Sequence, residues 1–138
     1  MENKITGEDK VQIRVSGESD VARCVLEAGQ MATRIGFSEN AQIMIATSVS
    51  ELSRNIMKYA GTGTILMSPI RKGDQAGMEV VARDHGPGIS DIEEAMADHF
   101  SSGGTLGLGL PGVRRLMDEF EIESASKLGT QVVCRKWC

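Results

Sequence analysis

The sequence predicts a two-layer α+β sandwich in which helices cover one face of a mixed or antiparallel sheet. Strand-like stretches lie near both ends of the chain, two helical segments follow each other without a strand between them, and the regular strand–helix alternation of a doubly wound sheet is missing. Segregated strands and helices are typical of α+β folds. At 138 residues the chain is expected to form one domain, residues 1–138, around a single core.

The first predicted elements are a strand and a helix. Residues 11–15 alternate between apolar and polar side chains, which indicates a strand with one buried face. Ser19 or Asp20 is the predicted N-cap of a helix that continues to about Ile35. Gly36 follows directly and is the predicted end of this helix, because glycine is common just after a helix C-terminus.

A second helix is predicted from the N-cap Ser38 to about residue 59. Its apolar residues recur at helical spacing, so they form one stripe that faces a core. These residues are Ile45, Val49, Leu52, Ile56 and Tyr59.

The second half of the chain predicts four strands and two helices. Apolar runs bounded by glycine, proline and polar turn residues indicate the strands, and Pro111 suits the first turn of a helix. In chain order we expect a strand at 64–70, a turn at 72–74, a strand at 78–83, a short helix at 91–98, a glycine-rich loop at 99–109, a helix at 111–119, and strands at 120–126 and 130–137.

Composition and charge narrow the class of protein. The formal net charge is -4, with isolated basic pairs, which argues against nucleic acid and anionic membranes as partners. No apolar run approaches the roughly 20 residues of a membrane span, and the polar start does not resemble a secretory signal. Three cysteines without a disulfide or zinc spacing suit a reducing compartment, so a cytoplasmic location is expected.

Polar side chains share one face of the second predicted helix. Glu51, Asn55 and Lys58 are spaced by four and three residues, which places a carboxylate, an amide and an ammonium next to the apolar stripe. Such a face can hold a base and a metal ligand. Taken alone, it is more typical of a solvated helix surface with an incidental ion pair, so the helix by itself does not decide the function.

A glycine-rich turn follows the predicted strand at 78–83. Asp84 stands at the strand end and precedes His85-Gly86-Pro87-Gly88, where the glycines would let a flat ring approach the backbone. The same residue types favour tight turns, so an ordinary turn also explains this segment.

A third stretch, residues 103–112, places glycines before a predicted helix. Glycines expose backbone N–H groups, and a helix N-terminus carries a partial positive charge, so this stretch predicts an anion site. Residues 107–112 also match G-x-G-x-x-G, but no strand directly precedes them, which excludes a dinucleotide fold. The chain has no Gly-Lys-Ser/Thr for a standard P-loop and no G-x-S-x-G hydrolase motif.

Together, segments 51–59, 84–89 and 103–112 resemble, in this order, the N box and the two glycine boxes of the gyrase, Hsp90, histidine kinase and MutL (GHKL) ATPase superfamily. Within it the chain is similar to the small serine/threonine kinases that regulate bacterial sigma-factor pathways, particularly the switch kinase associated with stressosomes. The run 107–120 is the most specific subgroup signal. The resemblance covers nearly the whole chain and implies the Bergerat ATP-binding fold.

The resemblance implies roles for the polar residues. Glu51 would be the general base that orients or deprotonates the accepting hydroxyl, and Asn55 would bind a Mg²⁺ ion that bridges the ATP phosphates. Asp84 would hydrogen-bond the adenine amino group. Lys58 would assist the phosphates, and Thr130 would lie beside the adenine pocket.

The glycine boxes would complete the nucleotide site. Gly86 and Gly88 would allow adenine to approach the backbone. The ATP lid would hold the remaining cofactor-binding residues, some of which would donate backbone N–H groups to phosphates. These are Gly103, Gly104, Thr105, Gly107, Leu108, Gly109 and Leu110.

The resemblance further implies a protein serine/threonine kinase that phosphorylates STAS-domain regulatory proteins in a stress-response, partner-switching pathway. A stressosome-type scaffold and a PP2C-type phosphatase are the partners it suggests. Histidine kinases carry a phosphoacceptor helix pair, and gyrase, Hsp90 and MutL carry further domains, none of which this sequence contains. An anti-sigma factor or phosphatase activator that acts by nucleotide-dependent binding is the alternative.

Overall fold

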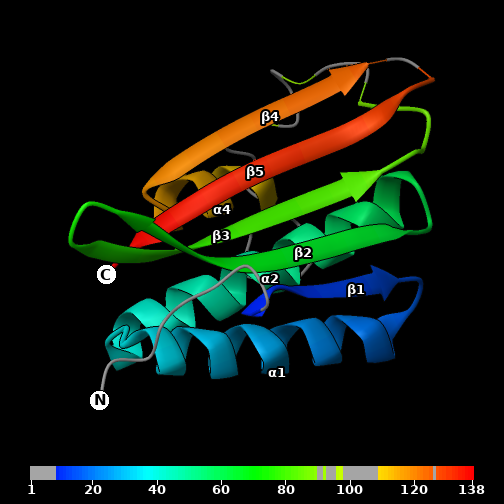
Figure 1. Ribbon diagram of the computed structural model, residues 1–138. Coiled ribbons are helices and arrows are strands. Elements are labelled where there is room, and N and C mark those ends of the chain that lie inside the picture. The colour runs from blue at the N-terminus through cyan, green and yellow to red at the C-terminus, as the bar shows by residue number, and fades with distance from the viewer. Residues whose placement is uncertain (1–8, 90–91, 93–95, 98–108, 126) are drawn as a thin grey trace.

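The computed structural model describes residues 9–89, 92, 96–97, 109–125 and 127–138, and it has the predicted α+β architecture (Figure 1). Within these residues the order of elements begins with a strand and two helices and ends with a β-hairpin. The elements are β1 (Val11–Val15), α1 (Glu18–Ile35), α2 (Glu39–Tyr59), β2 (Gly63–Lys72), β3 (Gln75–Asp84), α4 (Gly109–Leu116), β4 (Glu119–Ala125) and β5 (Gly129–Trp137).

The strands form one sheet in the order β1-β2-β3-β5-β4. Every strand pairing within the described residues is antiparallel, so of the two predicted alternatives the sheet is antiparallel and not mixed. The reason is that β5 lies between β3 and β4 and runs opposite to both, so the parallel strands β3 and β4 are not neighbours in the sheet.

The helices cover one face of the sheet, and the core lies between the two layers (Figure 1). Inward-facing residues of the strands alternate with outward-facing ones, as a half-buried sheet requires. The predicted stripe of α2 is buried except at its last position, since Tyr59 is only partly buried. The largest fully buried side chains include Ile13, Met31, Ile45, Leu52, Ile65, Met67 and Met78.

Two of the predicted helix ends are confirmed and one is corrected. The Ser38 hydroxyl caps α2 by accepting from the Ala41 backbone N–H at 3.2 Å, and Gly36 ends α1 with φ +106. The N-cap of α1 is Gly17, not Ser19 or Asp20, because both of those residues already lie in the first helical turn. Asp20 instead accepts from the Ser16 backbone N–H at 2.8 Å, one turn back.

The boundaries near the glycine-rich stretch differ from prediction. Helix α4 begins at Gly109, two residues before Pro111, and ends at Leu116, because Glu119 already belongs to strand β4. The predicted helix 91–98 and loop 99–109 lie largely outside the described residues, although the Met96 backbone N–H donates to the Ile92 carbonyl at 2.9 Å, as in a helical turn.

The three cysteines are free thiols. Cys24 and Cys134 are buried in the core, and Cys138 is exposed at the end of β5. Burial raises the pKa of the Cys134 thiol to about 12. None of the helices in the described part of the chain is sufficiently long and apolar to traverse a lipid bilayer.

Candidate functional site

Asp84 occupies the C-terminal end of β3 and is buried, with 6% of its surface exposed. Its Oδ1 atom accepts two backbone hydrogen bonds, from Gly86 N at 3.0 Å and from Thr130 N at 3.2 Å. Within the described residues its second oxygen, Oδ2, has no hydrogen bond. One oxygen therefore fixes the carboxylate, and the other is left to accept from a ligand.

The β4–β5 hairpin closes over the start of the turn that follows Asp84. A Cβ atom on Gly129 would lie 2.1 Å from the Asp84 carbonyl oxygen, and Gly129 has φ +98. Only glycine meets both conditions. The Lys127 backbone N–H also donates to the Pro87 carbonyl at 3.0 Å, so the hairpin and the turn are joined by backbone contacts.

The two glycines of the turn after Asp84, Gly86 and Gly88, are required because neighbouring segments of the chain pack closely against them. A Cβ on Gly86 would lie 2.5 Å from the Cβ of Ala60, at the end of α2. A Cβ on Gly88, which has φ +85, would lie 2.5 Å from the Ala125 carbonyl oxygen. The sequence predicted these glycines for the approach of adenine. The structure gives them a second reason, the close packing of three chain segments.

Ser124 is a structural residue beside this turn that the sequence analysis did not predict. Its hydroxyl oxygen accepts from the Ile89 backbone N–H at 2.7 Å and lies 2.7 Å from the Thr130 hydroxyl. The pair joins the far end of the turn to the hairpin. No local pattern marks a serine in an exposed-edge strand, because its partner is 35 residues away.

We refer to Asp84, Gly86, Gly88, Ser124, Gly129 and Thr130 as the strand-end corner. Thr130 is buried, with 7% exposed, and its hydroxyl lies against that of Ser124 in this cluster; its predicted place beside an adenine pocket stays a prediction. The corner is a set of backbone and short side-chain contacts with little space for rearrangement, and it holds the Asp84 carboxylate in one orientation.

The three residues of the predicted polar face of α2 differ in their exposure and in their contacts. Glu51 and Asn55 are half-buried and Lys58 is exposed. Within the described part of the chain, neither Glu51 nor Asn55 has a hydrogen bond or ion pair. The Lys58 ammonium lies 5.3 Å from the ring centre of Tyr59, its neighbour in sequence.

The end of α2 contacts the strand-end corner. The corner and the polar face of α2 therefore lie one after the other along the axis of the same helix. Ala60 directly follows α2 and packs on Gly86. With a rise of about 1.5 Å per residue, Asn55 lies about 8 Å and Glu51 about 14 Å along the helix axis from that contact. The elongated arrangement suits a ligand whose two ends are recognised separately.

Helix α4 packs beside α2 and begins where the glycine-rich stretch ends. Gly109 is its first residue, and the Leu110 side chain is buried in the core, so only the backbone of Leu110 is available to a ligand. The remaining predicted lid residues lie outside the described residues. These are Gly103, Gly104, Thr105, Gly107 and Leu108.

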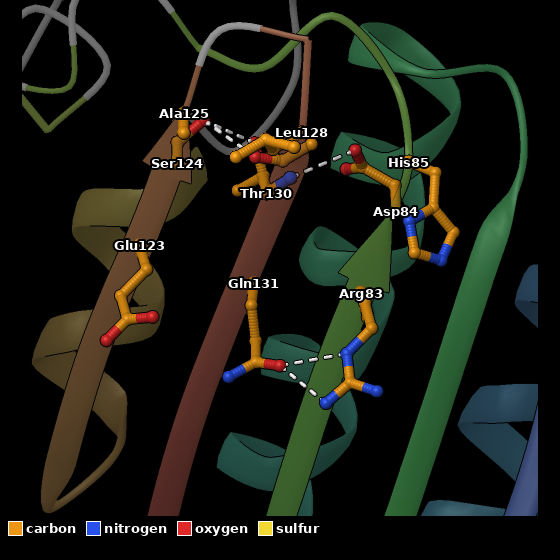
Figure 2. A pocket seen from close by; sticks show the side chains of 10 residues that line it. Arg83, Asp84, His85, Glu123, Ser124, Ala125, Leu128, Thr130 and Gln131 are labelled. Carbon is orange, nitrogen blue, oxygen red and sulfur yellow. Dashed lines mark hydrogen bonds between the residues drawn. The ribbon is translucent and has the colours of Figure 1, made fainter.

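A pocket of about 290 Å³ lies beside the corner, among the ends of β3, β4 and β5 (Figure 2). Arg83 borders it and donates from Nε at 2.8 Å and Nη2 at 2.6 Å to the Gln131 side-chain oxygen. Because side chains alternate along a strand, Arg83 and Gln131 lie on the sheet face opposite to that of buried Asp84 and Thr130. The pocket therefore opens mainly on the helix-free face.

The chain is similar to a known family of ATPase domains and to a bacterial protein kinase. The model of the family described as "Histidine kinase-like ATPase domain" matches residues 15–136. The chain is 41% identical over 129 residues to the serine/threonine-protein kinase RsbT of Bacillus subtilis (strain 168), covering 94% of this chain and 97% of that protein.

More distant relatives carry a different name. The chain is 25% identical over 119 residues to an anti-sigma F factor of Heyndrickxia coagulans, covering 70% of this chain and 81% of that protein. Among solved structures, the Mycobacterial sensor histidine kinase MprB matches with a TM-score of 0.54 and 19% identity, covering 93% of this chain and 95% of that one. At that identity the match concerns the fold alone.

Proposed function

The chain belongs to the histidine kinase-like ATPase domain family, and we propose that it is an ATP-dependent protein serine/threonine kinase. The family supports ATP as the nucleotide, and the 41% identity to a serine/threonine-protein kinase over nearly the whole chain supports protein phosphorylation. The structural observation that carries the proposal is the fixed Asp84 carboxylate at one end of α2, together with Glu51 and Asn55 farther along it, which have no partner within the described residues.

Asp84 would recognise adenine. Its Oδ2 atom is free to accept from the exocyclic amino group, while Oδ1 is fixed by two backbone donors. A carboxylate that is already oriented loses little conformational entropy when it binds. Thr130 would lie beside the base, with its hydroxyl oriented by Ser124.

Asn55 would hold Mg²⁺ through its side-chain oxygen. Nucleotide-bound Mg²⁺ keeps several water ligands and needs only one or two protein oxygens, so a single amide with no partner among the described residues fits this donor set. When bound, the ion would supply positive charge beside the transferring phosphoryl group. Backbone N–H groups of the lid and of Leu110 would bind phosphates, and Lys58 would reach them from α2.

Glu51 would be the general base. The oxygen of the acceptor hydroxyl forms a bond to the terminal phosphorus of ATP, the bond from that phosphorus to the bridging oxygen breaks, and ADP leaves. Glu51 orients the hydroxyl and takes its proton as the new bond forms. The Glu51 carboxylate has no partner in the described part of the chain, which supports its availability for this contact.

The proposed substrates are STAS-domain regulatory proteins that exchange partners when phosphorylated, with a stressosome-type scaffold and a PP2C-type phosphatase as further partners. The names of the relatives, a serine/threonine kinase and anti-sigma F factors, support a regulatory role. The second candidate, a regulator that acts by nucleotide-dependent binding with little transfer, rests on the anti-sigma relatives and fits less well than the kinase. Labelled ATP mixed with STAS domains separates the two, because binding without transfer supports the regulator.

The kinase assignment is tested by Glu51→Gln, with Glu39→Gln on the same helix as the matched control. Loss of the base is expected to lower kcat by about 10²–10⁴-fold while ATP still binds. Equal rates for Glu51→Gln and the wild-type chain would contradict the base assignment. Calorimetry of Asn55→Ala tests the metal role, and an unchanged affinity for ATP in Mg²⁺ would contradict it.

A further inference from the structure

Lys136 is a charged side chain on the inner face of the sheet. Along β5 the side chains of Val132 and Cys134 point into the core and are buried, and Lys136 continues the same alternation. Its register partner on β3 is Met78, which is fully buried. Only 12% of the Lys136 side chain is exposed. Because lysine is rarely buried without a partner for its charge, we expect the ammonium to be paired.

The partner of Lys136 is the C-terminal end of α4. Lys136 Nζ donates to the carbonyl oxygen of Leu116, the last residue of α4, at 2.7 Å. It also lies 3.8 Å from Asp118 Oδ1. The last carbonyls of a helix have no partner within the helix and carry a partial negative charge, so an ammonium there supplies both a donor and an opposite charge. We refer to Leu116, Asp118 and Lys136 as the α4 anchor.

The turn that follows α4 is joined to the same strand. The Asp118 backbone N–H donates to the Arg135 carbonyl at 2.9 Å, and Asp118 Oδ2 accepts from the Trp137 backbone N–H at 2.7 Å. Together with the bond from Lys136 to Leu116, these contacts use three consecutive residues of β5. The C-terminal end of α4 is therefore held to β5 by the backbone as well as by the ammonium.

Helix α4 has little stability of its own. Its eight residues, Gly109–Leu116, include two glycines and a proline. Short isolated helices are marginal in water, and glycine is unfavourable within them. The position of α4 must therefore come from its contacts: Leu110 and Val113 are buried, the helix packs beside α2 (Figure 1), and the α4 anchor holds its C-terminal end.

We propose that Lys136 is a positioning residue for the binding of the ATP phosphates. This role rests on the function proposed above, in which backbone N–H groups of Leu110 and of the lid bind phosphates at the start of α4. The helix is about 10 Å long from its first to its last residue, so a fixed C-terminal end also determines where its N-terminal end lies. Without the ammonium, the Leu116 carbonyl loses its donor and the short helix is free to shift. Lys136 thus acts on the phosphates through the backbone of α4.

The test compares two ligands that differ in their phosphates. Calorimetry measures the Kd of ATP in Mg²⁺ and the Kd of adenosine for the wild-type chain and for Lys136→Met, which keeps an unbranched side chain but removes the ammonium. We expect the Kd for ATP to rise about 10-fold, because the phosphates lose well-placed donors. The Kd for adenosine should change less than about 2-fold, because Met78 lies six residues, or about 20 Å, along β3 from Asp84. An unchanged Kd for ATP, or an equal rise for adenosine, overturns the proposal.

Two further variants separate positioning from stability. Lys136→Arg keeps a donor for the Leu116 carbonyl, so it should bind ATP within about 3-fold of the wild-type chain. Ile13→Val weakens the core on β1, at the opposite edge of the sheet from β4, and should leave the ratio of ATP affinity to adenosine affinity unchanged. The positioning role is contradicted if Lys136→Arg binds ATP as weakly as Lys136→Met, or if Ile13→Val changes the ratio equally.

The wild-type chain is measured first, so that failure of the positioning role and failure of the proposed function can be told apart. A wild-type chain that does not bind ATP contradicts the proposed function itself. A wild-type chain that binds ATP with the same affinity as Lys136→Met contradicts the positioning role alone and leaves the kinase proposal standing.

Discussion

The strand-end corner and the polar face of α2 are two halves of one candidate site that are built in opposite ways. In the corner, the Asp84 carboxylate is fixed by two backbone donors, and glycines allow three segments to touch. On α2, Glu51 and Asn55 have no partner within the described residues. The contacts of the corner are formed within the protein itself, whereas we propose that the helix face obtains its partners from the ligand.

This difference suits the two tasks proposed for the site. Recognition of a flat base benefits from a rigid acceptor, because little conformational entropy is then lost on binding. Phosphoryl transfer needs groups that engage only the transferring phosphate and the acceptor hydroxyl, since interactions present only in the transition state raise kcat. We therefore expect changes in the corner to affect stability and nucleotide affinity, and changes on the α2 face to affect the rate.

The largest effect is expected from Gly129→Ala. The new Cβ would strike the Asp84 carbonyl at 2.1 Å, and the positive φ adds backbone strain, so we expect a loss of about 4 kcal/mol in the free energy of unfolding. Gly36→Ala is the control, because Gly36 has φ +106 but open space around it, and its cost is about 1 kcal/mol. Equal losses in urea denaturation would show that the corner is not tightly packed.

A smaller effect is expected from Asp84→Asn. The amide oxygen can keep both backbone hydrogen bonds, but an NH₂ group replaces the acceptor Oδ2. We expect ATP affinity to fall about 10- to 150-fold, which corresponds to about 1.5–3 kcal/mol for a lost hydrogen bond to a charged group. Calorimetric titration with ATP measures this change. Wild-type affinity would mean that Asp84 is a structural residue only.

The helix face is expected to tolerate truncation. Glu51→Ala and Asn55→Ala should each change the free energy of unfolding by less than about 0.5 kcal/mol, because neither side chain has a partner to lose among residues 9–89, 92, 96–97, 109–125 and 127–138. Thermal or urea denaturation checks this expectation. A loss comparable to that of Gly129→Ala would remove the distinction between the two regions.

The pH dependence of stability should include a contribution from outside both regions. Hydrogen bonds from the Trp137 indole and from Arg135 lower the pKa of Glu119, at the opposite end of β4 from Ser124. Because its pKa is lowered in the folded state, Glu119 stabilises the fold at pH values above its ordinary pKa of 4.5. This stabilisation is lost as pH falls through the folded-state pKa. Glu119→Gln should therefore lower the melting temperature at pH 7, and the difference from wild type should shrink below pH 4.

Local sequence was sufficient for most elements of the fold. Alternation at 11–15 and the Ser38 cap predicted β1 and the start of α2 because both depend on neighbouring residues. The insertion of β5 between β3 and β4 was not predictable, since strand order depends on contacts between distant segments. The predicted N-cap of α1 was wrong because Ser19, Asp20 and Gly17 are all residue types that can cap a helix. Only the path of the chain from β1 selects Gly17.

For the candidate site, sequence patterns and the family resemblance selected the positions, and packing in the structure adds reasons for several of them that the sequence did not show. Asp84 and Thr130 stand 46 residues apart, and nothing local predicts that one binds the backbone of the other. Ser124 has no motif around it. The roles of Glu51, Asn55 and the lid glycines stay predictions, with five lid residues outside the described part of the chain.

Cys138 offers a practical means of observing the site without altering it. It is the exposed cysteine, and its backbone N–H donates to Ala76 at 2.9 Å, next to the β2–β3 turn and at the far end of β3 from Asp84. Cys24 and Cys134 are buried and should resist maleimide reagents in the folded protein. One fluorophore can thus be attached to the native sequence, so that anisotropy reports complex formation while the proposed catalytic face of α2 is left unmodified.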